Sequence, residues 1–215
     1  MVKMAEKGNA VVIFAKVPDL DIAKSRIAAT EGAEKAAAVY DELLEVTAAT
    51  AKGCHYHVAF AGAERPGRLE QIFSSSESFF PQYGNTLGKR LENAFLHIFA
   101  KGYSAACAIG CDCPYLSAHA FLETFSALKA ENDIVIGPAQ DGGYYLIGMN
   151  PGNEYVFSVD GWSRPELLAN TISAIKAKQG QYRLLNTLSD IDTIADYNSW
   201  KNAKQAPEVA GGGIS

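Results

Sequence analysis

Short apolar runs alternate along the whole chain with segments in which apolar residues recur at helical spacing. Ala10–Ala15 is apolar at every position, which is typical of a central parallel strand buried on both faces. Glu34–Thr50 instead places Tyr40, Leu43 and Leu44 on one stripe, as a helix that packs on a sheet does. This alternation predicts an α/β protein with a mostly parallel sheet and helices on both of its faces.

The same patterns give the expected elements. The strands are Ala10–Ala15, His55–Ala61, Ser78–Gln82, Ala105–Gly110, Asp133–Gly137, Tyr144–Met149 and Tyr182–Leu185, and the helices are Glu34–Thr50, Pro66–Phe73, Leu87–Ala100, Ala118–Lys129, Pro165–Lys178 and Ile194–Ala203. Ser117 suits an N-cap. At 215 residues and 48% hydrophobic, the chain can bury one core, so we expect a single domain over 1–205 and a flexible tail over 206–215.

Charge and hydropathy exclude several classes of function. Lys and Arg number 19 against 24 Asp and Glu, and no basic run is present, which argues against nucleic acid or an anionic membrane as a partner. No apolar stretch is long enough for a membrane span, and the charged start Met1–Lys7 is unlike a signal peptide. These features predict a cytoplasmic protein.

Three of the four cysteines, Cys107, Cys111 and Cys113, crowd into one apolar segment, and Cys54 is the fourth. A disulfide framework would disperse them, so we expect reduced thiols. A zinc site that recruits His55 and His57 is disfavoured, because no C-x-x-C pair is present.

Three cations, Lys16, Lys24 and Arg26, follow the first strand within one loop and helix start. Loops at the carboxyl ends of parallel strands bind ligands in such sheets, and Lys and Arg there can hold phosphate oxygens. A solvated basic loop is an equally good interpretation of these three residues alone.

Asp112 ends an otherwise apolar strand, just before Pro114. A carboxylate there is costly unless it binds a cation or accepts several hydrogen bonds, and Mg²⁺ or Mn²⁺ bridging it to ligand phosphates would meet that need. The alternative is an aspartate that caps the following turn.

Further candidates each have a structural alternative. Asp141, Gly142, Gly143 and Tyr144 offer close backbone approach and an aromatic face to a ligand, or form an ordinary hairpin turn. Asp190 and Asp192 of D-I-D-T could converge on a metal, or Asp192 or Thr193 could cap the next helix. Trp162 could stack on a ligand ring or fill a gap under a loop, and Gly88 with Arg90 could contact a nucleotide or mark a helix start.

In combination and in this order, the motifs resemble a bacterial family of nucleotide-diphospho-sugar transferase-like proteins, the branch often labelled radical-SAM/selenodomain-associated transferase. The motifs are F-A-K-x-P, K-S-R, Q-x-G-x-x-L-G-x-R, G-x-D-x-P, D-G-G-Y-Y-L-I-G and D-I-D-T. They extend from Val11 to about Tyr197, and D-G-G-Y-Y-L-I-G is the most specific.

The resemblance implies a glycosyltransferase-A fold, a Rossmann-like three-layer sandwich with its nucleotide site at the carboxyl ends of the strands. It implies a diphosphate facing Lys16, Lys24 and Arg26, a metal on Asp112 with Asp192 beside it, and a sugar or acceptor beside Asp141 and Tyr144. The nucleotide-side set is Lys16, Lys24, Arg26, Gly88, Arg90, Gly142, Gly143, Tyr144 and Trp162.

The chain departs from the family pattern in its acidic loop and on the acceptor side. Asp21, close to Asp19, stands where glycine is usual and adds negative charge beside the expected phosphate site. Cys111 replaces a small hydroxyl residue, and Arg164 stands where threonine commonly follows the W-x pair. The glycosyltransferase D-x-D is incomplete, since Cys113 and Pro114 follow Asp112.

The sequence therefore predicts an enzyme that uses Mg²⁺ or Mn²⁺ to transfer a glycosyl group from a nucleotide sugar to an unidentified acceptor. Asp112 and Asp141 are the candidate catalytic residues. One alternative is a nucleotidyltransferase, similar to phospholactate guanylyltransferases, that releases pyrophosphate from a nucleoside triphosphate. Another is a catalytically degenerate nucleotide-binding module.

Overall fold

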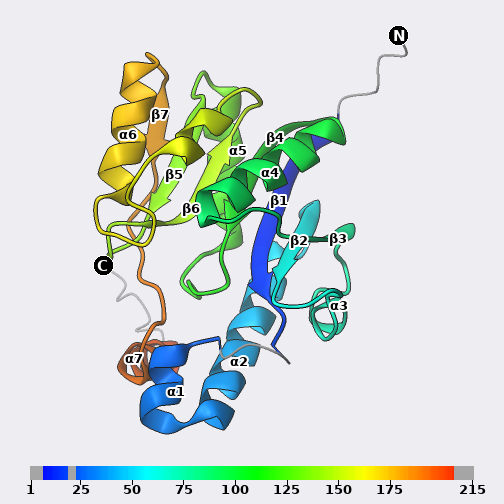
Figure 1. Cartoon of the computed structure of the whole chain (residues 1–215), viewed down its shortest axis with the longest axis vertical. Helices are drawn as coiled ribbons and strands as arrows, with labels where there is room; N and C mark the ends of the chain where they lie inside the picture. The colour runs from blue at the N-terminus through cyan, green and yellow to red at the C-terminus, as the bar shows by residue number, and fades with distance from the viewer. Residues whose placement is uncertain (1–6, 19–22, 206–215) are drawn as a thin grey trace, which may run out of the picture.

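The computed structural model of the chain describes residues 7–18 and 23–205, which share one twisted sheet with helices on both sides (Figure 1). Its seven strands are β1 (Lys7–Lys16), β2 (Tyr56–Ala61), β3 (Ser78–Pro81), β4 (Tyr103–Ile109), β5 (Ile134–Pro138), β6 (Tyr144–Met149) and β7 (Tyr182–Leu184). They lie in the order β3-β2-β1-β4-β6-β5-β7, and only β6 runs antiparallel to its neighbours. The predicted mostly parallel, mixed sheet is confirmed.

The expected helices are present, two of them with the expected bounds and the others with ends shifted by a few residues. They are α2 (Ala33–Ala51), α3 (Leu69–Ile72), α4 (Leu87–Ala100), α5 (Ala118–Lys129), α6 (Leu167–Ala177) and α7 (Ile194–Gln205). The sequence did not predict α1 (Ser25–Glu31) or the 3₁₀ helix η1 (Glu154–Ser158) as separate elements. Both are too short to show an apolar period, since they bury only one and two residues.

Alternating side chains of β1 explain the three layers. Val11 and Ile13 pack in a cluster with α2, α3 and α5 on one face of the sheet. Ala10 and Val12 pack on the other face in a cluster with α4, η1 and α6. Because successive residues of a strand point to opposite faces, a run that is apolar throughout needs helices on both sides. The structure confirms the predicted α/β/α sandwich.

A third apolar cluster joins α1, α2 and α7, which lie together at one end of the molecule (Figure 1). Trp200 of α7 is 2% exposed and packs with Ile27 of α1. Ile191, in the loop before α7, is also fully buried in this cluster. The cluster thus fixes the loop that carries the D-I-D-T motif.

The helix starts differ in how they are capped. Ser117 occupies the predicted N-cap position of α5 in an extended conformation, although its side chain makes no capping hydrogen bond. Thr193 and Asp196 instead form a reciprocal cap at α7. The Thr193 amide donates to Asp196 Oδ2 at 2.8 Å, and the Asp196 amide donates to Thr193 Oγ1 at 3.2 Å.

In the part of the chain that the structure describes, no helix is long and apolar enough to cross a membrane. The four cysteines are free, as expected for reduced thiols. The tail expected at 206–215 lies outside the described residues, as do Asp19 and Asp21.

The cap of α7 gives a test of the fold. Thr193→Ala removes both hydrogen bonds of the Thr193 hydroxyl, and we expect a loss of about 1 kcal/mol in the free energy of unfolding. Denaturant unfolding measures it, with Asn198→Ala on the exposed side of α7 as the control. Equal stability of Thr193→Ala and the wild type would contradict the capping role.

Candidate active site

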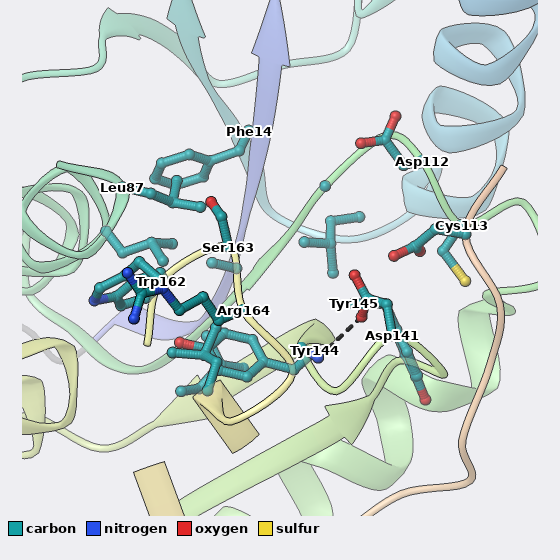
Figure 2. A pocket seen from close by; sticks show the side chains of 18 of the residues that line it. Phe14, Leu87, Asp112, Cys113, Asp141, Tyr144, Tyr145, Trp162, Ser163 and Arg164 are labelled. Atoms are coloured by element: carbon teal, nitrogen blue, oxygen red, sulfur yellow. Dashed lines mark hydrogen bonds between the residues drawn. The ribbon is translucent and has the colours of Figure 1, made fainter. Parts of the chain in front are cut away.

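A pocket of about 590 Å³ opens at the edge of the sheet where β1 and β4 end (Figure 2). The turn between β5 and β6 lies at the same edge, because β6 runs antiparallel to both β4 and β5, so β5 ends where β4 ends. The segment that leads into α6 and the start of α4 supply the remaining walls. This is the edge at which open α/β sheets bind ligands.

One side of the pocket is acidic. Asp112 follows β4, Asp141 lies in the β5–β6 turn and Asp190 lies in the loop before α7, and all three line the pocket. Asp112 has a side chain 51% exposed, so it can reach a ligand. The strand end therefore delivers a carboxylate to the pocket, as the sequence predicted.

Lys24 is the cation of this acidic side. Its ammonium pairs with Asp112 and donates to the backbone carbonyl of Ile191 at 2.6 Å, and its side chain is only 5% exposed. Lys24 adopts a left-handed conformation, with φ 66°, at the start of α1. In this state Lys24 holds the Asp112 carboxylate rather than facing open solvent.

Asp190 carries the largest carboxyl pKa shift that is resolved among the described residues. Burial, followed by the charges of Asp112 and Asp141, raises the pKa of Asp190 to about 7, against an opposing effect of Lys24. The charges of Asp112, Asp141 and Lys24 thus all act on the Asp190 carboxyl. Near neutral pH a cation that entered the pocket would compete with a proton for this carboxyl.

The β5–β6 turn is built as a turn and also forms a wall. The Gly143 amide donates to Asp141 Oδ1 at 2.9 Å, which closes a local loop of the kind that aspartate favours. Gly142 has φ 88°, and a Cβ there would lie 2.2 Å from the carbonyl oxygen of Pro165. The hairpin-turn alternative therefore holds, and the same turn still presents Asp141 to the pocket.

The opposite side of the pocket is apolar and aromatic. Phe14, Leu87, Leu91 and Trp162 line it, and the Tyr144 ring meets the Trp162 ring edge-on at 6.1 Å. Burial raises the pKa of the Tyr144 phenol far above its usual value, so it stays protonated. This surface suits an apolar or planar group of a ligand.

Gly88 lies behind Trp162 and not in the pocket lining. A Cβ at this position would lie 2.6 Å from the Trp162 ring and 2.5 Å from the carbonyl oxygen of Phe157. Gly88 therefore acts through close packing of α4 on η1 and Trp162. Trp162 was predicted either to fill space under a loop or to face a ligand. Its ring fills the space beside Gly88, and it also lines the pocket.

Of the residues predicted for the site, Arg26, Asp112, Asp141, Gly143, Tyr144 and Trp162 line the pocket. Lys24 and Gly142 lie directly behind this lining. The structure does not bring Lys16 or Arg90 into the lining. Lys16 is exposed at the end of β1, and the Arg90 guanidinium donates to the Gly84 carbonyl at 3.0 Å and borders a smaller hollow beside His97.

Asp192 is placed outside the pocket lining, where its carboxylate accepts a hydrogen bond from Arg26 at 2.8 Å. Asp190 and Asp192 do not converge, because Ile191 between them is anchored in the third cluster and its amide donates to the Asp112 carbonyl at 2.8 Å. The acidic residue that the sequence interpretation underrated is Asp190. The sequence signal that could have separated the two aspartates is the apolar Ile191 between them, because its burial in the core restricts the directions of its neighbours.

The carboxylate oxygens that line the pocket meet only some of the requirements of a hard divalent metal ion. Among the described residues, no group of three or more His, Cys, Asp or Glu side chains is arranged to hold a metal. Asp112 and Asp190 supply carboxylate oxygens to one pocket and influence each other electrostatically. Mg²⁺ and Mn²⁺ are commonly held by one or two carboxylates together with ligand phosphates, and that arrangement fits these residues.

Solved structures with the same architecture define the class of fold. A crystal structure from Desulfovibrio desulfuricans G20, described as a "putative nucleotide-diphospho-sugar transferase", matches with TM-score 0.84 and 24% identity over 93% of this chain and 89% of that one. A cytidylyltransferase from Leptospira borgpetersenii matches at 0.59 and 13% over 90% and 84%. The 4-diphosphocytidyl-2C-methyl-D-erythritol synthase from Anaerococcus prevotii matches at 0.62 and 12% over 93% and 96%. The chain thus has the fold of nucleotide-diphospho-sugar transferase-like proteins.

Residues 43–164, more than half of the chain, match the family described as "Uncharacterized protein conserved in bacteria (DUF2064)", and the chain belongs to this family. A comparison with curated proteins gave no match.

The pKa of Asp190 predicts a pH-dependent stability. The folded protein keeps a proton on Asp190 up to about pH 7, whereas the unfolded chain loses it near 3.8. The folded state binds more protons between these values, so the contribution of Asp190 to stability falls as the pH rises through this window. Asp190→Asn should melt a few degrees above the wild type at about pH 8, and the difference should vanish below pH 4.

Thermal melts across this pH range measure the effect. Asp160→Asn, an exposed aspartate outside the pocket lining, is the control and should show no such trend. A difference that stays constant with pH would show that Asp190 is not the group responsible.

Proposed function

We propose that the protein is a transferase that binds a nucleoside-diphosphate sugar with Mg²⁺ or Mn²⁺ and passes the glycosyl group to a small-molecule acceptor. The observation that carries this proposal is the juxtaposition of Asp112, Asp141 and Asp190 in one pocket at the carboxyl edge of the sheet. The fold shared with nucleotide-diphospho-sugar transferase-like proteins supports it.

Asp112 and Asp190 would hold the ion, and Asp192 stays a candidate beside them through its pairing with Arg26. The bound ion would offset the negative charge that develops on the leaving nucleoside diphosphate. Arg26 pairs with Asp192 on the exposed rim of the pocket and would have to exchange this partner to hold a phosphate, and Lys16 lies exposed on the same edge. Lys24 acts as a positioning residue for Asp112.

Asp141 would act on the acceptor. Its Oδ1 is occupied by the Gly143 amide, which fixes the direction of the carboxylate toward the pocket. A carboxylate held in this way can orient an acceptor hydroxyl and take its proton. Gly143 would let backbone approach the ligand closely, while Gly142 packs against Pro165 behind it.

Nucleotidyl transfer is the second candidate, because structures described as cytidylyltransferases share this fold. A phosphorylated acid or sugar phosphate would then attack a nucleoside triphosphate, and pyrophosphate would be released. The same acidic side and the same cations would serve this reaction, so the ligand and the product separate the two candidates. A degenerate binding module would bind a nucleotide without turnover.

A thermal-shift panel of nucleotide sugars, diphosphates and triphosphates, each with Mg²⁺, Mn²⁺ or EDTA, tests the proposal. We expect a metal-dependent rise with a nucleotide sugar of roughly 5 to 10 °C at a hundredfold excess over Kd. Asp112→Asn should abolish the metal-dependent part, and Asp160→Asn should keep it. A shift with triphosphates alone, together with pyrophosphate release, would support nucleotidyl transfer, and no shift with any nucleotide would contradict both.

A further inference from the structure

Arg164 is a cation in the pocket wall that has no partner in the described part of the chain. The pocket has two arginines in its lining, and the other, Arg26, is paired with Asp192 at 2.8 Å. No salt bridge, side-chain hydrogen bond or cation–π contact of Arg164 is present among the described residues. Its guanidinium is therefore available to an anion that enters the pocket.

The backbone around Arg164 is held in a fixed, tight path. Gly161 and Ser163 both have positive φ, at 98° and 63°, and Ser163 is one of few non-glycine residues in this region. The Arg164 amide donates to the Gly161 carbonyl at 2.9 Å, and the Leu167 amide donates to the Arg164 carbonyl at 3.2 Å. A non-glycine residue in this conformation costs about 1 kcal/mol or more, which such bonds must offset. Arg164 thus starts from a well-defined position.

The surroundings of Arg164 are apolar. Trp162, Tyr144 and Leu87 line the same side of the pocket, and Leu87 remains 46% exposed. Arg164 is itself exposed at the pocket wall, so its guanidinium is open to an entering anion and its planar fork can pair with an oxyanion beside the aromatic and aliphatic surface. This end of the pocket suits a molecule with both an anionic group and an apolar or planar skeleton.

The two ends of the pocket are different in charge. Figure 2 shows Arg164 and Trp162 on one side and Asp112 and Cys113 on the other, with Asp141 facing into the pocket. Under the proposed function the donor diphosphate and its metal lie at the Asp112 end. An anion of the second substrate is repelled by those carboxylates and attracted by Arg164.

We infer that Arg164, Trp162 and Tyr144 form a subsite for an anionic acceptor, whose carboxylate or phosphate binds the guanidinium while its skeleton lies against the aromatic rings. This inference rests on the proposed function, since it names the class of acceptor for the same pocket. The acceptor hydroxyl is then directed toward Asp141. Arginine binds both kinds of oxyanion through paired hydrogen bonds.

Calorimetric titration of the whole protein with benzoate, phenyl phosphate and the neutral benzamide tests the subsite without turnover. Both anions should bind more tightly than benzamide, and the better of the two identifies the acceptor group. Arg164→Gln should weaken binding of the anions roughly tenfold or more and leave benzamide unchanged. Arg183→Gln, which removes a 53% exposed arginine from β7, should change none of the three.

Three results would overturn the inference: anions that bind no better than benzamide, anion binding unchanged in Arg164→Gln, or loss of nucleotide-sugar binding in that variant with anion binding intact. The last would assign Arg164 to the donor. Failure of the proposed function is recognised separately, because it removes the metal-dependent nucleotide shift while Arg164-dependent anion binding persists.

Discussion

The ion pair between Lys24 and Asp112 connects three segments that are far apart in the sequence. The Lys24 ammonium contacts the carboxylate after β4 and the carbonyl of Ile191 before α7, and the Ile191 amide in turn donates to the Asp112 carbonyl. A lysine that is 5% exposed needs such partners, because burial of an unpaired ammonium costs several kcal/mol. Polar contacts therefore link three segments beside the pocket: the start of α1, the end of β4 and the loop before α7. We call this set of contacts the polar joint.

This joint also determines where negative charge remains in the pocket. Asp190 is mostly buried and has like charges beside it, and Lys24, which is directed at Asp112, opposes these effects only in part, so the pKa of the Asp190 carboxyl rises to about 7. Arg26 is directed at Asp192 on the outside. The pocket thus keeps an acidic side, and an arginine without a carboxylate partner on another wall, because Lys24 and Arg26 already have carboxylate partners among the described residues.

How much could be predicted from the sequence depended on whether a residue lies in a periodic segment. Strands such as β6 and helices such as α4 were predicted with their observed bounds, because their apolar positions repeat. Asp112 was placed correctly because strand ends define the edge of a sheet. The directions of Asp190 and Asp192 were not predictable in this way. They depend on Ile191 packing against α1, α2 and α7, a contact between residues distant in sequence. Arg90 and Lys24 likewise took backbone or carboxylate partners that no local pattern indicates.

Backbone contacts, more than side chains, set the distance between the two ends of the pocket. Gly142, beside Asp141, lies against Pro165, beside Arg164, and the Gly142 carbonyl accepts a hydrogen bond from the Leu168 amide at 3.0 Å. A side chain at position 142 would have to push these walls apart, since its Cβ would meet the Pro165 carbonyl oxygen at 2.2 Å. Asp141 and Arg164, which we propose to face the hydroxyl and the anion of the acceptor, are consequently carried by segments in direct contact. A pocket held in this way selects ligands by the separation of their polar groups, which side-chain rotation alone would not fix.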